Sequence, residues 1–205
     1  KGTSADKRLE IFDGYKAGRT KPADDFYAQL PILRELLAAF NWPLYELDRY
    51  EADDIMGTFA LQAKEKDVEA CLITGDYDLL QLISDNTKVY ITRTGSTDLV
   101  RYDDDAFEEK YGVKVAQFVD YKALVGDSSD NIPGVPRIGP KAAQALLTAY
   151  GDLDGIYAHV DEVKGAQQKY LTEGKDSAYM SQKLAQIFTD APITIDWDEA
   201  DIERT

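Results

Sequence analysis

The chain has 205 residues, of which 38 are acidic and 23 basic, and its formal net charge is −15. Its hydrophobic share of 44% is enough to bury an ordinary core, which excludes a disordered chain. With one cysteine and one histidine it excludes a disulfide framework and a zinc or iron–sulfur ligand set, so oxygen atoms must hold any metal. The sequence contains no signal peptide, membrane-spanning stretch or lipidation motif, and we expect a soluble, cytoplasmic monomer without a membrane partner.

The first half of the sequence alternates predicted helices and strands. After a basic N-terminal stretch, apolar residues at helical spacing predict an amphipathic helix from Asp24 to Phe40, which Pro31 should kink or split. The pattern then predicts a strand over 43–47, a helix towards Lys66, a buried strand over 69–74 with Cys71 packed inside, a short helix over 78–84 and a strand over 88–92. This alternation is typical of a parallel α/β sheet.

The second half is predicted to be helical. Helices are expected over 104–111, 115–125 and 141–150, followed by at least two more and by a strand over 193–197. We therefore divide the chain into an α/β core over 1–103 and a helical region over 104–205.

Three acidic blocks lie where the predicted strands end and the helices begin. Their members are Glu51, Asp53, Asp54, Asp76, Asp78, Asp127 and Asp130. Since such turns gather at one edge of a parallel sheet, we expect the carboxylates to share a crevice. So much like charge requires cations, and two Mg²⁺ or Mn²⁺ ions about 4 Å apart suit phosphodiester hydrolysis. Each block alone also has a structural explanation: helix capping for Asp53 and Asp54, an Asx turn for Asp76 and Asp78, and an acidic loop before a helix for Asp127 and Asp130.

A glycine-punctuated hairpin follows the last acidic block. Gly134 and Gly139 carry no Cβ, which would let a nucleic-acid backbone approach the main-chain N–H groups. Arg137 and Lys141 add positive charge next to it. The net negative charge of the chain opposes nucleic-acid binding in general, so we expect binding to be local and metal-dependent.

The basic stretch places Lys16 and Arg19 three residues apart, on one face of a predicted helix. Cations there could stabilise the charge on a transferring phosphate. A solvated basic turn is the simpler alternative.

Taken together, these blocks resemble the 5′-nuclease domain at the front of bacterial DNA polymerase I, which also stands alone in the flap endonuclease family. The resemblance runs from about Lys7 to the C-terminus and implies a PIN-like, resolvase-like core. It implies a structure-specific nuclease that removes RNA primers and flaps from branched, 5′-flapped duplex DNA in replication and repair, in the bacterial nucleoid. Glu51, Asp53, Asp54 and Asp76 match the first metal site or its water shell, and Asp78, Asp127 and Asp130 match the second.

The resemblance also assigns roles to the basic stretch and the hairpin. Lys16 and Arg19 match catalytic cations in a helical arch, Tyr15 is placed to stack on a frayed base, and Arg8 is similar to a phosphate contact. The hairpin, at about 115–150, resembles a helix–three-turn–helix that grips duplex DNA, often with a monovalent cation such as K⁺. Arg137 stands where that turn commonly has glycine.

The family begins with two strands, each bearing an aspartate ligand, that this sequence lacks. We therefore expect a fragment of a longer enzyme that continues into polymerase domains, and expect the fragment itself to cleave flaps poorly. Two alternatives stay open: a catalytically deficient module that only binds branched DNA, and another metal-dependent phosphohydrolase or ribonuclease.

Overall fold

The structure, a computed structural model, describes residues 4–93 and 98–201. At its centre is a three-stranded sheet of order β1-β2-β3, formed by β1 (Ala70–Thr74), β2 (Thr87–Thr92) and β3 (Leu99–Tyr102). β1 and β2 are parallel, as predicted. β3 was missed: it is short and pairs antiparallel with β2, so the sheet is mixed. Its cross-strand partners were not visible in the local pattern.

β1 is an edge strand of the described sheet, and most of its residues are not buried. Of the five residues of β1 only Leu72 is buried, whereas Ile73 is 58% exposed. Cys71 is exposed as well, so the prediction of a buried strand with a packed cysteine is wrong. An apolar run alone does not distinguish a central strand from an edge strand.

Two elements beside the sheet carry two of the three acidic blocks. Helix α3 (Ala52–Glu65) contacts β1, and the 3-10 helix η1 (Tyr77–Leu82) joins β1 to β2. Both elements were predicted, the second of them as an ordinary helix. Leu79 and Leu80 of η1 are fully buried, which fixes the turn that follows β1 against the core.

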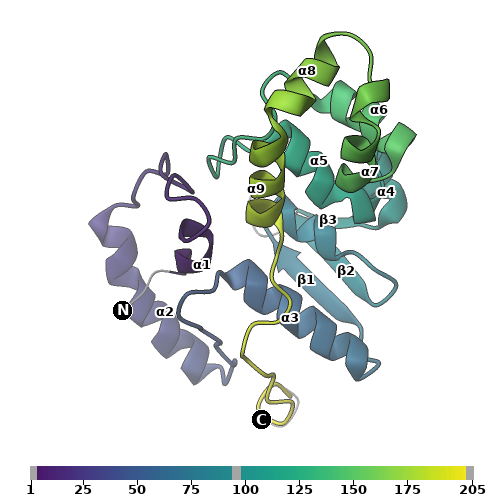
Figure 1. Ribbon diagram of the computed structural model, residues 1–205. Helices are drawn as coiled ribbons and strands as arrows, with labels where there is room; N and C mark the ends of the chain where they lie inside the picture. The colour runs from purple at the N-terminus through teal and green to yellow at the C-terminus, as the bar shows by residue number, and fades with distance from the viewer. Residues whose placement is uncertain (1–3, 94–97, 202–205) are drawn as a thin grey trace.

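The helical half stacks above the sheet in Figure 1. Its elements are α4 (Asp104–Tyr111), η2 (Val115–Gln117), α5 (Phe118–Val125), α6 (Pro140–Tyr150), α7 (Leu153–Ala158), η3 (Val160–Glu162), α8 (Ala166–Glu173) and α9 (Lys175–Ala185). Helix α5 is central and contacts both α6 and α9. The buried Asp120 of α5 accepts hydrogen bonds from the Leu153 N–H and the Gln182 side chain, which ties α5 to α7 and α9.

The hairpin between α5 and α6 is closed by main-chain packing and held by α9. Gly134 has φ of 64°, and a Cβ there would lie 2.4 Å from the Gly126 nitrogen, so only glycine fits. The Gly134 N–H donates to Ser181 Oγ at 3.0 Å, and Ser177 Oγ donates to the Gly134 carbonyl at 2.7 Å. The two serines of α9 therefore satisfy both main-chain groups of this glycine.

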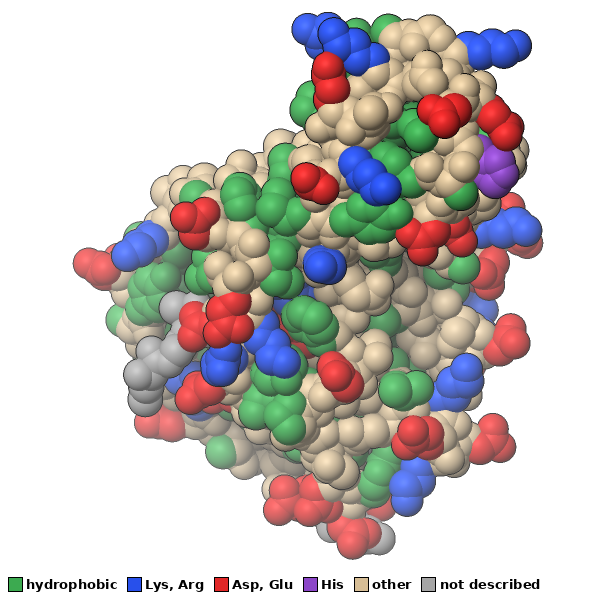
Figure 2. Space-filling view, viewed as in Figure 1, with side chains coloured by type: hydrophobic (Ala, Val, Ile, Leu, Met, Phe, Trp, Pro, Cys, Tyr) green, Lys and Arg blue, Asp and Glu red, His purple; other side chains and the backbone are tan. Residues whose placement is uncertain are grey.

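The N-terminal part comprises α1 (Asp6–Leu9), a series of turns, and α2 (Asp24–Ala39). Helix α2 is continuous through Pro31, so the proline does not split it. No residue of α2, which the structure describes in full, is buried. Its apolar face is therefore open to solvent, and Figure 2 shows hydrophobic side chains over this part of the molecule.

The last described segment runs from α9 along α3, as Figure 1 shows. Three polar side chains of α3, spaced every fourth residue, bind its main chain: Asp54 accepts from the Phe188 N–H, Thr58 from the Ala191 N–H and Gln62 from the Ile195 N–H. Gln62 also donates to the Ile193 carbonyl. Because this main chain bonds to a helix instead of a neighbouring strand, the strand predicted over 193–197 does not form.

The strand predicted over 43–47 is likewise irregular in the structure. Within the described residues, no helix is long and apolar enough to cross a membrane.

Candidate metal centre

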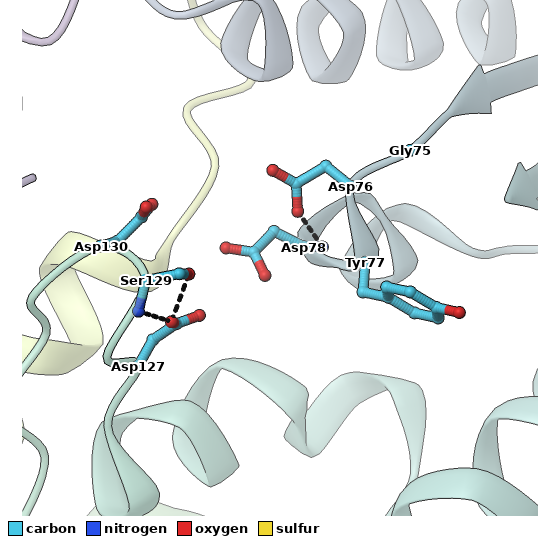
Figure 3. Close-up of a pocket in the computed structure, with 7 residues that line it drawn as sticks. All are labelled: Gly75, Asp76, Tyr77, Asp78, Asp127, Ser129 and Asp130. Carbon is cyan, nitrogen blue, oxygen red and sulfur yellow. Dashed lines mark hydrogen bonds between the residues drawn. The ribbon is translucent and has the colours of Figure 1, made fainter. Parts of the chain in front are cut away.

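A cavity of about 400 Å³ lies between η1 and the loop that follows α5. It is lined by Gly75, Asp76, Tyr77, Asp78, Asp127, Ser129 and Asp130. Figure 3 shows Asp76 and Asp78 on one side facing Asp127 and Asp130 on the other, whereas the Tyr77 ring points away. The structure thus brings two of the three predicted acidic blocks together from segments far apart in the sequence.

Local turn chemistry orients the lining carboxylates. Asp76 Oδ1 accepts from the Asp78 N–H at 2.9 Å, which caps η1. Asp127 Oδ1 accepts from both the N–H and the hydroxyl of Ser129, at 2.8 and 2.6 Å. The Asx turn expected at Asp76 is therefore present, and Asp127 forms a similar turn. Both are compatible with a metal site because each turn fixes the direction of the carboxylate.

The remaining acidic block lies beside the cavity, at the start of α3. Burial, together with the nearby carboxylates of Asp76 and Glu51, raises the pKa of Asp53 to about 6. The nearby Lys16 ammonium acts in the opposite direction. Like charges that raise a pKa must lie close to one another, so Asp53 and Glu51 share the electrostatic field of the cavity.

Two cations of the basic stretch bind these carboxylates. Lys16 Nζ lies 2.6 Å from Glu51 Oε2 and 3.6 Å from Asp130 Oδ2. Arg19 donates to Asp130 Oδ1 through both Nε, at 3.1 Å, and Nη2. The two cations therefore meet at Asp130, on the rim of the cavity.

The basic stretch is a turn and not a helix, so the prediction that Lys16 and Arg19 share a helical face is wrong. Lys16 has φ of 56°, a left-handed conformation that interrupts a helix. The turn is docked on the acidic loop: the Lys16 N–H donates to the Asp130 carbonyl at 2.9 Å, and Asn131 Nδ2 donates to the Gly14 carbonyl at 2.6 Å. These bonds bring the cations to the cavity.

A third cation, Lys122, was missed by sequence reasoning. Its ammonium contacts Asp78 Oδ1 and lies 2.7 Å from Asp127 Oδ2. Burial opposes ionisation of Asp127, but hydrogen bonds from Lys122 and Ser129 outweigh it and lower the pKa of Asp127 to about 2. The only signal in the sequence was a lysine within the apolar helix that leads to Asp127.

Asp54 and Arg8 form a buried ion pair, which does not fit the roles predicted for them. Asp54 is fully buried, and its carboxylate accepts two hydrogen bonds from Arg8, at 2.8 and 2.9 Å. It also accepts from the N–H groups of Glu51 and Phe188. Both oxygens are therefore engaged inside the protein, and Arg8, which is 3% exposed, is unable to reach a phosphate in this arrangement.

Tyr15 and Gly134 are also placed differently from the prediction. The Tyr15 ring is 4% exposed and packs in a small core with Ile132 and Leu184, so it is not free to stack on a base. Burial raises the pKa of Tyr15, and the protonated hydroxyl donates to Asp130 at 3.1 Å. The Gly134 N–H donates to Ser181 and is not available for a phosphate.

The remaining hairpin residues are open to solvent. Arg137, Gly139 and Lys141 are exposed, and the last two lie at the start of α6. Arg137 has φ of 70°, a conformation that glycine adopts more easily, and its guanidinium lies over the Tyr170 ring. The charge and the helix N-terminus suit an anion at this surface.

The donor set of the cavity fits hard divalent cations, because every charged ligand is a carboxylate. Within residues 4–93 and 98–201, no three acidic, histidine or cysteine side chains are already arranged to hold a metal ion. Lys16, Arg19 and Lys122 bind Glu51, Asp78, Asp127 and Asp130, so ammonium and guanidinium groups supply the positive charge that this arrangement requires.

Known proteins match both halves of the chain. Residues 2–112 match the 5′-3′ exonuclease N-terminal resolvase-like domain, and residues 113–205 match the 5′-3′ exonuclease C-terminal SAM fold. DNA polymerase I of Bacillus caldotenax is 46% identical over 193 residues, which cover 94% of this chain and 22% of the relative. DNA polymerase I of Bacillus subtilis is 47% identical, with 92% of this chain and 22% of the relative covered. The chain thus spans about a fifth of the length of these relatives.

Solved structures agree with the sequence matches. A bacteriophage T5 flap endonuclease in complex with DNA and metal ions is 25% identical, with a TM-score of 0.72 over 92% of this chain and 72% of that chain. The catalytic core of Rad2, in complex with a DNA substrate, is 17% identical and shares the fold alone, with a TM-score of 0.58 over 95% of this chain and 64% of that chain.

Fold and cavity together define an α/β nuclease of the PIN-like type, with an acidic site at the end of its sheet. The sequence matches then identify it more closely: the chain belongs to the 5′-3′ exonuclease family.

Proposed function

We propose that the protein is a structure-specific nuclease that hydrolyses DNA phosphodiesters at 5′ ends and flaps, with two Mg²⁺ or Mn²⁺ ions. The observation that carries this proposal is the cavity itself, where carboxylates of the η1 turn and of the loop after α5 face one another beside three cations, with Glu51 joined to this loop through Lys16. Divalent ions held by these carboxylates would lower the pKa of a water nucleophile and offset the negative charge of the phosphodiester.

The chain's own residues divide into ligands, cations and supports. Glu51, Asp53 and Asp76 serve the first ion, and Asp78, Asp127 and Asp130 serve the second. Lys16 and Arg19 turn from the carboxylates to the scissile phosphate, where they stabilise developing charge. Arg8, Asp54 and Tyr15 hold the ligands in place instead of binding metal or DNA.

The helical region supplies the grip on duplex DNA. Arg137, Gly139 and Lys141 contact backbone phosphates next to the α6 N-terminus and do not recognise the base sequence. A K⁺ ion also binds at the hairpin. In this division residues 1–103 carry the chemistry and 104–205 the binding. The similarity to DNA polymerase I supports primer and flap removal at the nucleoid, beside polymerase domains.

A flap-cleavage assay tests this function. In a full-length enzyme that carries these residues, a 5′-labelled flapped duplex should be cut with Mg²⁺ present and left intact with EDTA. Asp76→Asn should stop cleavage, whereas Asp105→Asn, on the exposed face of α4, should not. Flap binding without metal-dependent cleavage would identify a binding module instead, and cleavage that ignores the free 5′ end would indicate a different phosphohydrolase or ribonuclease.

A second prediction concerns DNA binding by the hairpin. Arg137→Gly, which suits the left-handed backbone, and Lys141→Ala should each weaken DNA binding and lower the slope of log K against log salt by about one unit, because each removes one phosphate contact. The rate of cleavage at saturating DNA should change little. Fluorescence anisotropy across a salt series measures the slope, with Lys64→Ala on exposed α3 surface as control. Unchanged affinity in both hairpin variants would remove the hairpin from the interface.

A further inference from the structure

Lys122 differs from the other cations of the site in how deeply it is enclosed. Its side chain is 8% exposed, compared with 19% for Lys16 and 51% for Arg19. It extends from α5 past the Phe118 ring, with Nζ 5.9 Å from the ring centroid, and ends between two carboxylates. Burying an ammonium group is costly unless it is paired, so this lysine depends on its partners.

The two partners come from opposite walls of the cavity. Asp78 belongs to η1, and Asp127 belongs to the loop after α5. The ammonium contacts Asp78 Oδ1 and lies 2.7 Å from Asp127 Oδ2, so one side chain joins both walls. The proposed function assigns these same two carboxylates to the second metal ion.

We propose that Lys122 is a positioning residue that acts as the resident counter-ion of the second metal site, and that an arriving divalent ion competes with its ammonium for Asp78 and Asp127. This inference rests on the proposed two-ion function. Before metal arrives, the lysine keeps two like charges from different segments at close range, which would otherwise repel each other.

The burial of Lys122 determines whether its ammonium can move away when a divalent ion binds. Lys16 and Arg19 border solvent and are able to withdraw to a bound phosphate. Lys122 is a buried residue of α5. Its charge therefore stays beside the ion even after one contact is broken. Repulsion from this retained charge makes the second ion bind more weakly than the first.

Mn²⁺ titration of the protein by isothermal calorimetry tests the proposal, with Lys122→Met as the variant. One unit charge removed a few ångströms from the ion should lower the weaker Mn²⁺ dissociation constant about tenfold or more. The stronger one should change less than about threefold. Lys110→Met is the matched control, because this lysine is exposed and its ammonium lies over the Tyr77 ring, which points away from the cavity.

Thermal unfolding separates this role from a merely structural one. The Lys122→Met variant should melt below wild type without metal, and saturating Mn²⁺ should recover most of the difference. An equal loss of melting temperature with and without Mn²⁺, together with unchanged dissociation constants, would overturn the proposal.

Wild-type crystals provide a measurement that does not depend on the variant folding. Comparison with and without Mn²⁺ should show Lys122 Nζ leaving at least one of its two carboxylates when an ion binds them. An ion held by Asp78 and Asp127 with both lysine contacts intact would contradict the competition. If wild type bound no Mn²⁺ in the cavity, the proposed function would fail as well. If wild type bound two ions and the Lys122→Met isotherm were unaltered, only this inference would be wrong.

Discussion

In a full-length enzyme that carries these residues, Lys16→Ala should lower the single-turnover rate of flap cleavage by about 10²-fold or more, while the affinity for flapped DNA stays within a few-fold. A cation aimed at the scissile phosphate acts mainly on charge that develops in the transition state. Lys16 is placed for this because its Nζ lies 2.6 Å from Glu51 and 3.6 Å from Asp130, at the rim of the acidic cavity. Its main-chain bond to Asp130 holds the turn there in the absence of DNA.

The measurement combines rapid-quench cleavage at saturating enzyme with an equilibrium titration of the same DNA in Ca²⁺. Lys21→Ala is the matched control, since it removes an exposed positive charge from the same basic stretch. Both variants should bind alike, and only Lys16→Ala should be slow. Loss of affinity in Lys16→Ala with an unchanged rate in the bound complex would make this turn an anchor for DNA and reverse its assigned role.

Arg8→Met should lower the free energy of unfolding by about 3–5 kcal/mol, because it leaves the charge of Asp54 buried and unpaired. The geometry is strict: Arg8 donates two bonds to Asp54 and two more to the carbonyls of Leu184 and Gln186. One guanidinium therefore joins α1, the start of α3 and the end of α9.

Urea denaturation of a double-mutant cycle isolates the pair. Adding Asp54→Asn to Arg8→Met should recover part of the loss, since no buried charge then remains. Arg34→Met is the matched control, because the Arg34–Glu46 pair is 50% and 65% exposed and such pairs contribute about 0–1 kcal/mol. If Arg8→Met and Arg34→Met lowered the free energy of unfolding equally, the buried pair would contribute no more to stability than an exposed pair.

Local chemistry made part of the site predictable from sequence. Asp76 and Asp127 lie in turns whose hydrogen bonds reach only two residues along the chain, and α3 begins directly after Glu51. Strand-end and helix-start signals are short-range, so they located the acidic blocks and most helices. The strand β3 escaped because its pairing with β2 depends on residues outside any local window.

Long-range partners explain the errors in the residue roles. The aspartates at 53 and 54 are adjacent in sequence, yet one reaches the cavity field and the other is saturated by Arg8, 46 positions away. Tyr15 was expected to stack on a base, but its hydroxyl donates to Asp130, 115 positions away. Lys122 reads as an ordinary helical lysine until the fold places Asp78 beside it.

The ladder of α3 side chains along residues 188–195 has an evolutionary consequence. Asp54, Thr58 and Gln62 bind only main-chain atoms of the segment, which every amino acid except proline provides in full. Substitutions at solvent-facing positions of that segment should therefore drift freely without altering its path. Ala191 is buried and the Phe188 ring packs against Tyr50 and Arg8, so side-chain requirements remain at these two positions. Tolerance to substitution should therefore be low there and at the three positions of α3, and high only at the exposed positions of the segment.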